Sequence, residues 1–154
     1  MLISKKLALK NCINLMYFLF FLYSANCHAT CWTYASNKFG IDKKLLIAIA
    51  QVESGMNPNA IAKNYNGSYD IGLMQINSSH MSQLNKLGLT EERLKSDPCI
   101  SVLVGASILA DMMKVYGYSW EAVGAYNAGT GKTHHDLRMR YAKKVWGVYR
   151  NTGH

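Results

Sequence analysis

Two acidic residues, Glu53 and Asp70, stand apart from the other seven, which fall at predicted helix caps, in first helical turns or on an exposed helix face. Glu53 ends a predicted helix whose residues 45–52 are nearly all apolar. The negative end of the helix dipole and partial burial both disfavour an ionised carboxylate, so we expect a raised pKa. A carboxylic acid that stays protonated near neutral pH can protonate a glycosidic oxygen. The alternative is an exposed Glu53 at a frayed helix end.

Asp70 follows a strong hairpin turn signal, Asn66-Gly67, and precedes Ile71-Gly72. Two roles are open for this carboxylate. It can hydrogen-bond loop backbone, as Asp commonly does beside turns. It can also be a second carboxylate that faces Glu53 across a cleft.

The elements that must position these carboxylates are predominantly helical. A short helix is expected from Cys31 to Lys38, and the final helix from Asp136 to Tyr149. Between them, predicted helices begin after good N-cap residues, namely Asp42, Ser78, Thr90, Asp97 and Ser119. The helix after Asp97-Pro98 carries apolar residues on one face, which is typical of a long core helix. With one small β-hairpin around Asn66-Gly67, the sequence predicts an α+β fold that is mostly α-helical.

Residues 1–29 have the pattern of a cleaved secretory signal peptide: early lysines, an apolar run and a small residue, Ala29, at the cleavage position. The apolar run of about 13 residues is shorter than the roughly 20 that span a bilayer as a helix. An uncleaved anchor and a lipoprotein modified at Cys27 are the alternatives. We therefore predict one domain at residues 30–150, a tail at 151–154, a periplasmic location and no stable membrane span after cleavage.

Of four cysteines, Cys12 and Cys27 leave with the signal peptide, whereas Cys31 and Cys99 remain. Two cysteines in an exported domain predict one disulfide. No set of residues has zinc-binding spacing, including the neighbourhood of His134 and His135. The sequence therefore predicts a Cys31–Cys99 disulfide, no metal and no cofactor.

The chain has 154 residues, with 17 Lys and Arg against 9 Asp and Glu. That length argues against a TIM barrel, and the 49% hydrophobic content argues against disorder. Removal of the signal peptide lowers the net charge to +5. Export and the lack of interleaved basic and aromatic residues argue against a nucleic-acid partner. We expect a monomer.

Three ordered motifs resemble those of the lytic transglycosylases with a lysozyme-like domain: Glu53 to Pro58, Gly72 to Asn77 and Ala125 to Gly129. The small, single-domain members that accompany type III and type IV secretion, conjugation and pilus systems match best. The resemblance covers nearly the whole mature chain. It implies a lysozyme-like fold and cleavage of the β-1,4 bond between N-acetylmuramic acid and N-acetylglucosamine in peptidoglycan. It also implies an apparatus of that kind as partner.

Within this resemblance, Glu53 is the single catalytic acid. The implied substrate-binding residues are Ser54, Gly72, Met74, Gln75, Tyr126 and Asn127. Each has a structural alternative, because Met74 can belong to the core, Tyr126 can pack and Asn127 can end a helix. The Tyr126 phenol is expected near the catalytic acid.

Three departures from the family pattern leave the reaction open. Met56 stands where many relatives carry an aromatic residue, and Asn77 where larger relatives often have Pro. Asp70 follows Glu53 by a separation similar to that of the two carboxylates in animal lysozymes. The predicted reaction forms a 1,6-anhydro end with Glu53 as acid and base. The alternatives are a hydrolytic muramidase that uses Glu53 and Asp70, and a peptidoglycan-binding module without turnover.

Overall fold

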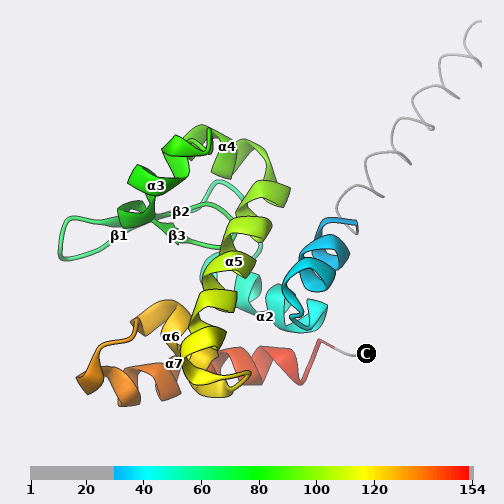
Figure 1. Ribbon diagram of the computed structural model, residues 1–154, viewed down its shortest axis with the longest axis vertical. Coiled ribbons are helices and arrows are strands. Elements are labelled where there is room, and N and C mark those ends of the chain that lie inside the picture. The colour runs from blue at the N-terminus through cyan, green and yellow to red at the C-terminus, as the bar shows by residue number, and fades with distance from the viewer. Residues whose placement is uncertain (1–29, 153–154) are drawn as a thin grey trace, which may run out of the picture.

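The computed structural model describes residues 30–152, which fold into a helical domain with a small sheet (Figure 1). The predicted signal peptide and the last two residues of the predicted tail lie outside the described part. Residues 30–39 are helical, and the elements that follow are α2 (Lys43–Ser54), β1 (Ile61–Lys63), β2 (Tyr69–Ile71), β3 (Ile76–Asn77), η1 (Ser78–His80), α3 (Met81–Lys86), α4 (Glu91–Ser96), α5 (Pro98–Tyr116), α6 (Trp120–Ala128), η2 (Lys132–His134) and α7 (His135–Tyr149).

Side chains cap four of the helices at the predicted residues. The oxygens of Asp42, Thr90, Asp97 and Ser119 each accept a hydrogen bond from a backbone N–H of the first turn that follows. Such a bond satisfies one of the free N–H groups of a helix start and is typically worth about 1 kcal/mol. These four helix starts are therefore confirmed.

The predicted helix start at Ser78 is wrong. Asn77 caps the short 3₁₀ helix η1, and α3 begins only at Met81. The Ser78 hydroxyl instead accepts a hydrogen bond of 3.1 Å from the backbone N–H of Tyr69 on β2. A tertiary contact therefore uses the side chain that the sequence pattern assigned to a cap.

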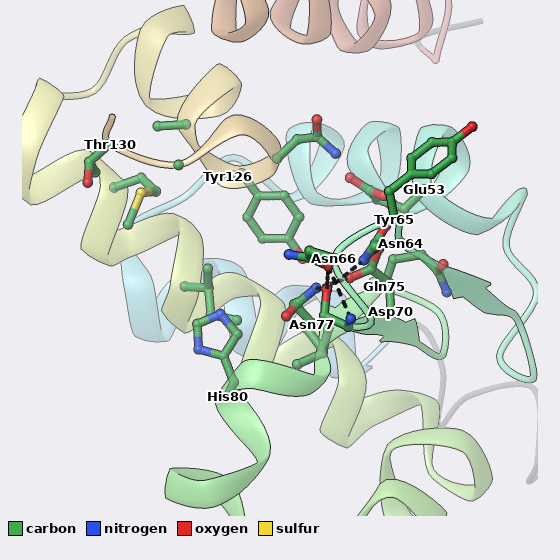
Figure 2. A pocket seen from close by; sticks show the side chains of 17 residues that line it. Glu53, Asn64, Tyr65, Asn66, Asp70, Gln75, Asn77, His80, Tyr126 and Thr130 are labelled. Atoms are coloured by element: carbon green, nitrogen blue, oxygen red, sulfur yellow. Dashed lines mark hydrogen bonds between the residues drawn. The ribbon is translucent and has the colours of Figure 1, made fainter. Parts of the chain in front are cut away.

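The sheet has three antiparallel strands in the order β1-β2-β3, so it is larger than the single hairpin predicted from the sequence. The third strand, Ile76–Asn77, is too short to show a period-2 pattern. Its register places Asn77 opposite Asp70, and Figure 2 shows the two side chains close together. The predicted class, α+β and mostly α-helical, is confirmed.

Helix α5 crosses the middle of the domain, between the sheet and the pair formed by α6 and α7 (Figure 1). Among the described residues it is the one helix long and apolar enough to cross a bilayer, by length and composition alone. Its Val102, Ala106 and Leu109 are buried among the core residues of the other elements. Helix α5 is therefore the core helix that the sequence predicted.

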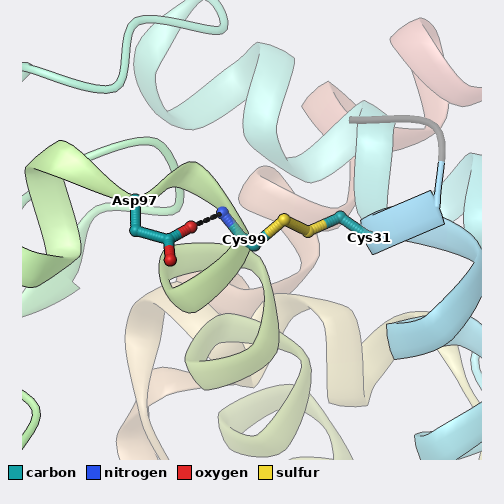
Figure 3. Close-up of a disulfide and its surroundings, with 3 residues drawn as sticks. All are labelled: Cys31, Asp97 and Cys99. Carbon is teal, nitrogen blue, oxygen red and sulfur yellow. Dashed lines mark hydrogen bonds between the residues drawn. A yellow bond between two sulfur atoms is a disulfide. The ribbon is translucent and has the colours of Figure 1, made fainter. Parts of the chain in front are cut away.

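A disulfide joins Cys31, in the helix at residues 30–39, to Cys99 in the first turn of α5 (Figure 3). The two residues are 68 positions apart, with Cα atoms 5.5 Å from each other. The Cys99 backbone N–H also donates to the Asp97 cap at 2.9 Å. The predicted pairing is confirmed, and it fastens the start of the described chain to the core helix.

Candidate active site

A cleft of about 690 Å³ lies between the sheet and helices α5 and α6 (Figure 2). Segments from along most of the domain meet there. Its lining includes Glu53, the turn between β1 and β2, Asp70, Gln75, Asn77, His80, two side chains of α5, and the end of α6 with the loop after it. Both carboxylates singled out in the sequence therefore border one cleft.

Glu53 is the penultimate residue of α2, which Gly55 ends in the left-handed conformation. The glycine N–H returns to the carbonyls of Ala50 and Gln51, so the helix stops directly after the acid. Burial raises the pKa of Glu53 to about 7, and the negative charge of Asp70 adds to this increase. A hydrogen bond from Tyr141 and the positive charge of Lys144 act in the opposite direction. The raised pKa agrees with the sequence prediction, with desolvation as its main cause.

Tyr141 is a site residue that the sequence analysis missed. It lies on α7, is buried, and donates its phenolic hydrogen to the Glu53 carboxyl group. Burial and the neighbouring Glu53 raise the pKa of the phenol, so Tyr141 remains a donor at all ordinary pH values. No sequence signal links two residues 88 positions apart. The helical spacing of Arg138, Tyr141 and Lys144 is the one hint that Tyr141 belongs to a functional face.

Asp70 occupies the central strand β2, and amide groups bind both of its carboxylate oxygens. Asn64 donates to one oxygen at 3.0 Å, and Asn77 donates to the other at 2.7 Å. Asp70 therefore accepts hydrogen bonds from side chains, whereas one of its two predicted roles was to bond loop backbone. Both oxygens act as acceptors, and the carboxylate borders the cleft, where its negative charge raises the pKa of Glu53.

The motif from Gly72 to Gln75 is a tight turn beside the cleft. Gly72 has φ of +75°, and a Cβ there would lie 2.8 Å from the Leu94 carbonyl oxygen, so this position needs glycine. Gln75 lines the cleft at φ of +48°, and its amide donates to the carbonyls of Ala60 and Gly72. Its amide hydrogens therefore hold the turn together.

Met74 lies in the core and is not among the residues that line the cleft. It packs against Gly105 of α5, where an added Cβ would lie 2.8 Å from the Met74 Cε. Its backbone N–H donates to the buried Ser101 hydroxyl at 3.1 Å. Of the two interpretations of Met74, the core one fits its position.

Ser54 and Tyr126 both bind backbone carbonyls of this turn. The Ser54 hydroxyl lies 2.7 Å from the Leu73 carbonyl and 3.2 Å from that of Ala50, outside the cleft lining. The Tyr126 phenol lines the cleft and donates to the Met74 carbonyl at 2.7 Å. Burial raises its pKa well above the ordinary value, and the charge of Glu53 adds to this. Tyr126 is thus near the acid, but the phenol bonded to that acid belongs to Tyr141.

Asn127 lines the cleft at the end of α6, together with Gly129 and Thr130 in the loop that follows. Other lining residues that the sequence analysis did not select are Tyr65, His80, Ile108 and Met112. Of these four, Tyr65 is the one that the sequence could have revealed, because it precedes the predicted turn Asn66-Gly67 and an aromatic residue at a hairpin tip is exposed. Among the described residues, no three His, Cys, Asp or Glu side chains cluster so that they could hold a metal ion.

Comparison with known proteins identifies the family of this chain. The model of the transglycosylase SLT domain family matches residues 30–148. The chain belongs to the SLT transglycosylase family. It is a peptidoglycan lytic transglycosylase by class, and a peptidoglycan substrate implies a location outside the cytoplasm.

Three relatives of this SLT transglycosylase are proteins of Salmonella, Shigella and Escherichia. The invasion protein IagB of Salmonella typhimurium is 63% identical over 122 residues, which cover 79% of this chain and 76% of that protein. Protein IpgF of Shigella flexneri is 46% identical over 121 residues, covering 79% and 80%. The X polypeptide of Escherichia coli K12 is 44% identical over 126 residues, covering 80% and 75%.

A similar solved structure is an inactive mutant of the lytic transglycosylase Slt from Pseudomonas aeruginosa. The TM-score is 0.63 at 20% sequence identity. The match covers 82% of this chain, which spans about a quarter of that larger protein, 24% of its length. At this identity the likeness establishes a shared fold.

Proposed function

We propose that this transglycosylase cleaves the β-1,4 bond between N-acetylmuramic acid and N-acetylglucosamine, with Glu53 as both acid and base. The observation that carries the proposal is the position of Glu53 in a cleft of about 690 Å³, where burial raises its pKa to about 7. A group that titrates near the working pH exchanges protons efficiently in both directions.

In the first step, protonated Glu53 donates its proton to the glycosidic oxygen. The bond from that oxygen to C1 of the muramoyl residue breaks, and positive charge develops on the sugar ring. In the second step, the Glu53 carboxylate takes the proton of the muramoyl 6-hydroxyl, and O6 bonds to C1. Glu53 is thereby reprotonated, water is not consumed, and the product carries a 1,6-anhydro end.

Two neighbours of Glu53 fit these steps. The Tyr141 phenol donates to the carboxyl group and fixes its orientation through both protonation states. The negative charge of Asp70 lies close enough to raise the pKa of Glu53, and it would stabilise the positive sugar ring that develops in the cleft. This role of Asp70 does not require a covalent bond to the substrate.

Asp70 is also the observation that favours a second candidate, a hydrolytic muramidase. In this alternative the carboxylate stabilises the cationic intermediate long enough for water to attack C1. The product then has a reducing end and is one water heavier. Product chemistry therefore separates the two reactions without reference to rate.

For the biological setting, we propose that residues 1–29 export the enzyme to the periplasm, where it opens peptidoglycan for a type III or type IV secretion, conjugation or pilus apparatus. The signal-like composition of this segment supports export. The name of the Salmonella relative, invasion protein IagB, supports a link to invasion.

The test is mass spectrometry of soluble muropeptides after incubation of residues 30–154 with purified peptidoglycan. We expect anhydro-ended products from the wild type and a loss of at least about a hundredfold in Glu53→Gln. Reducing ends would establish the muramidase. Equal activity of Glu53→Gln and the wild type would exclude Glu53 as the acid, and no release from either would favour a binding module.

A further inference from the structure

Arg138 of α7 is a buried charged residue that the proposed mechanism does not use; it is only 4% exposed. Its guanidinium donates from Nε and Nη2 to one carboxylate oxygen of Glu121 on α6, at 3.1 and 3.0 Å. Nη1 donates to the carbonyl oxygens of Gly129 and Gly131, at 3.3 and 2.9 Å. One side chain thus joins the first turn of α6 to the loop after its last turn.

Close packing of α6 against α7 puts Arg138 in this place. Gly124 of α6 faces the Arg138 backbone so closely that an added Cβ would collide with it. The guanidinium also lies over the Tyr116 ring at the end of α5, 4.9 Å from its centroid. A planar fork with several donors suits such a multiple contact, whereas a lysine ammonium does not.

The loop that Arg138 holds forms one wall of the cleft. Asn127, Gly129 and Thr130 line the cleft, and residues 129–133 are all exposed. The loop therefore has no buried side chain of its own to anchor it. Hydrogen bonds to backbone carbonyls hold this segment instead. Arg138 of α7 binds the carbonyls of Gly129 and Gly131, and His134 Nδ1 of η2 lies 2.7 Å from the Ala128 carbonyl.

We propose that Arg138 is a positioning residue for the substrate: it holds the Asn127–Thr130 wall where this wall meets the glycan strand. Arg138 contacts the wall at the Gly129 carbonyl and also binds Glu121, whereas Tyr141, three residues later on α7, contacts Glu53. The two side chains therefore act on different parts of the reaction. Loss of Arg138 weakens substrate binding and leaves proton transfer by Glu53 in place.

The kinetic test compares Arg138→Met and Arg138→Lys with the wild type on soluble glycan strands, and it rests on the proposed function for its substrate. Arg140→Met is the matched control, because Arg140 is exposed on the same helix. For Arg138→Met we expect KM to rise about tenfold while kcat changes by less than about twofold. The pH at which the rate falls stays that of the wild type. Arg138→Lys recovers part of the loss, since it keeps the charge without the fork.

A binding measurement keeps the inference testable if the proposed reaction fails. Chitohexaose, a β-1,4 hexamer of N-acetylglucosamine, is titrated into Glu53→Gln and into Glu53→Gln combined with each Arg138 change. We expect about tenfold weaker binding when Arg138→Met is present. Thermal unfolding is measured on every protein. If Arg138→Met does not fold, the comparison of Arg138→Lys with the wild type provides the test. KM and hexaose affinity equal to those of Arg140→Met, or a displaced pH profile, would overturn the inference.

Discussion

The phenolic hydroxyl of Tyr141 donates a hydrogen bond to the carboxyl group of Glu53, from a helix 88 positions later in the chain. This bond lowers the pKa of Glu53, whereas burial raises it, and burial is the larger effect. The outcome is a carboxyl group that titrates at about pH 7. The chemistry proposed for the cleft therefore depends on how α7 packs against α2.

Tyr141→Phe should shift the pH profile upward. Without the phenolic donor, the ionised form of Glu53 loses stabilisation, so its pKa rises above about 7. The limb on which kcat/KM falls with increasing pH should move to higher pH in muropeptide-release assays. Tyr149→Phe, which removes a phenol bonded to Asp42 instead, is the control. An unchanged or downward-shifted limb would contradict this account of Glu53.

Asp70→Asn should shift the same limb in the opposite direction. The negative charge of Asp70 raises the pKa of Glu53, so its neutralisation lowers that pKa. The product should keep its 1,6-anhydro end if Glu53 alone carries out both proton transfers. Asp111→Asn is the control, because Asp111 is exposed and paired with Lys114. Loss of all turnover in Asp70→Asn would make Asp70 a catalytic partner.

Glu53→Gln should stabilise the folded protein in mildly alkaline solution. A carboxyl group whose folded pKa is raised contributes stability below its ordinary value of 4.5, and this stability is lost as pH rises through about 7. Gln does not ionise, and its amide oxygen can still accept from Tyr141. At pH 8 the variant should therefore exceed the wild type by about 2 kcal/mol in urea unfolding. The difference should disappear near pH 4, and an equal gain at both pH values would exclude this cause.

Removal of the Cys31–Cys99 disulfide should destabilise the domain strongly. The bond closes a loop across 68 positions, so its loss enlarges the conformational freedom of the unfolded chain. The double change Cys31→Ser and Cys99→Ser should lower the free energy of unfolding by about 4 kcal/mol. Wild type in reductant is the matched comparison. A loss below about 1 kcal/mol would show that core packing alone holds the first helix.

Lys143→Glu tests whether the basic surface of α7 retains the enzyme on the wall. Lys143 is exposed, and the stem peptides of peptidoglycan carry carboxylates. We expect weaker sedimentation with purified peptidoglycan and a weaker dependence on salt, because screening acts on exposed charges. Lys143→Gln separates loss of attraction from added repulsion. If all three proteins bind alike, the surface is an ordinary solvated helix face.

The sequence by itself determined the features that depend on near neighbours. The caps at Asp42, Thr90, Asp97 and Ser119 follow from a side chain and the backbone two or three residues away. The raised pKa of Glu53 followed from its place at the end of an apolar helix. The disulfide followed from a count, because only two cysteines remain after residue 29.

The tertiary structure decided which of the motif residues face the cleft. Gln75, Tyr126 and Asn127 line the cleft, whereas Met74 lies in the core and Ser54 binds a backbone carbonyl of the Gly72 turn. The partner of Glu53 is Tyr141, a residue outside the recognised motifs. A shift of one residue along the chain changes the face of a helix or strand that a side chain occupies, and packing decides which face is inward.

The same reason explains the sheet and the loop wall. Strand β3 forms because Asn77 pairs with Asp70, and a two-residue strand has no pattern of its own. The loop after α6 is held by Arg138 through backbone carbonyls, which every residue type possesses. Contacts to the backbone leave no trace in residue identity at the accepting position. Such contacts become visible only when distant segments are packed together.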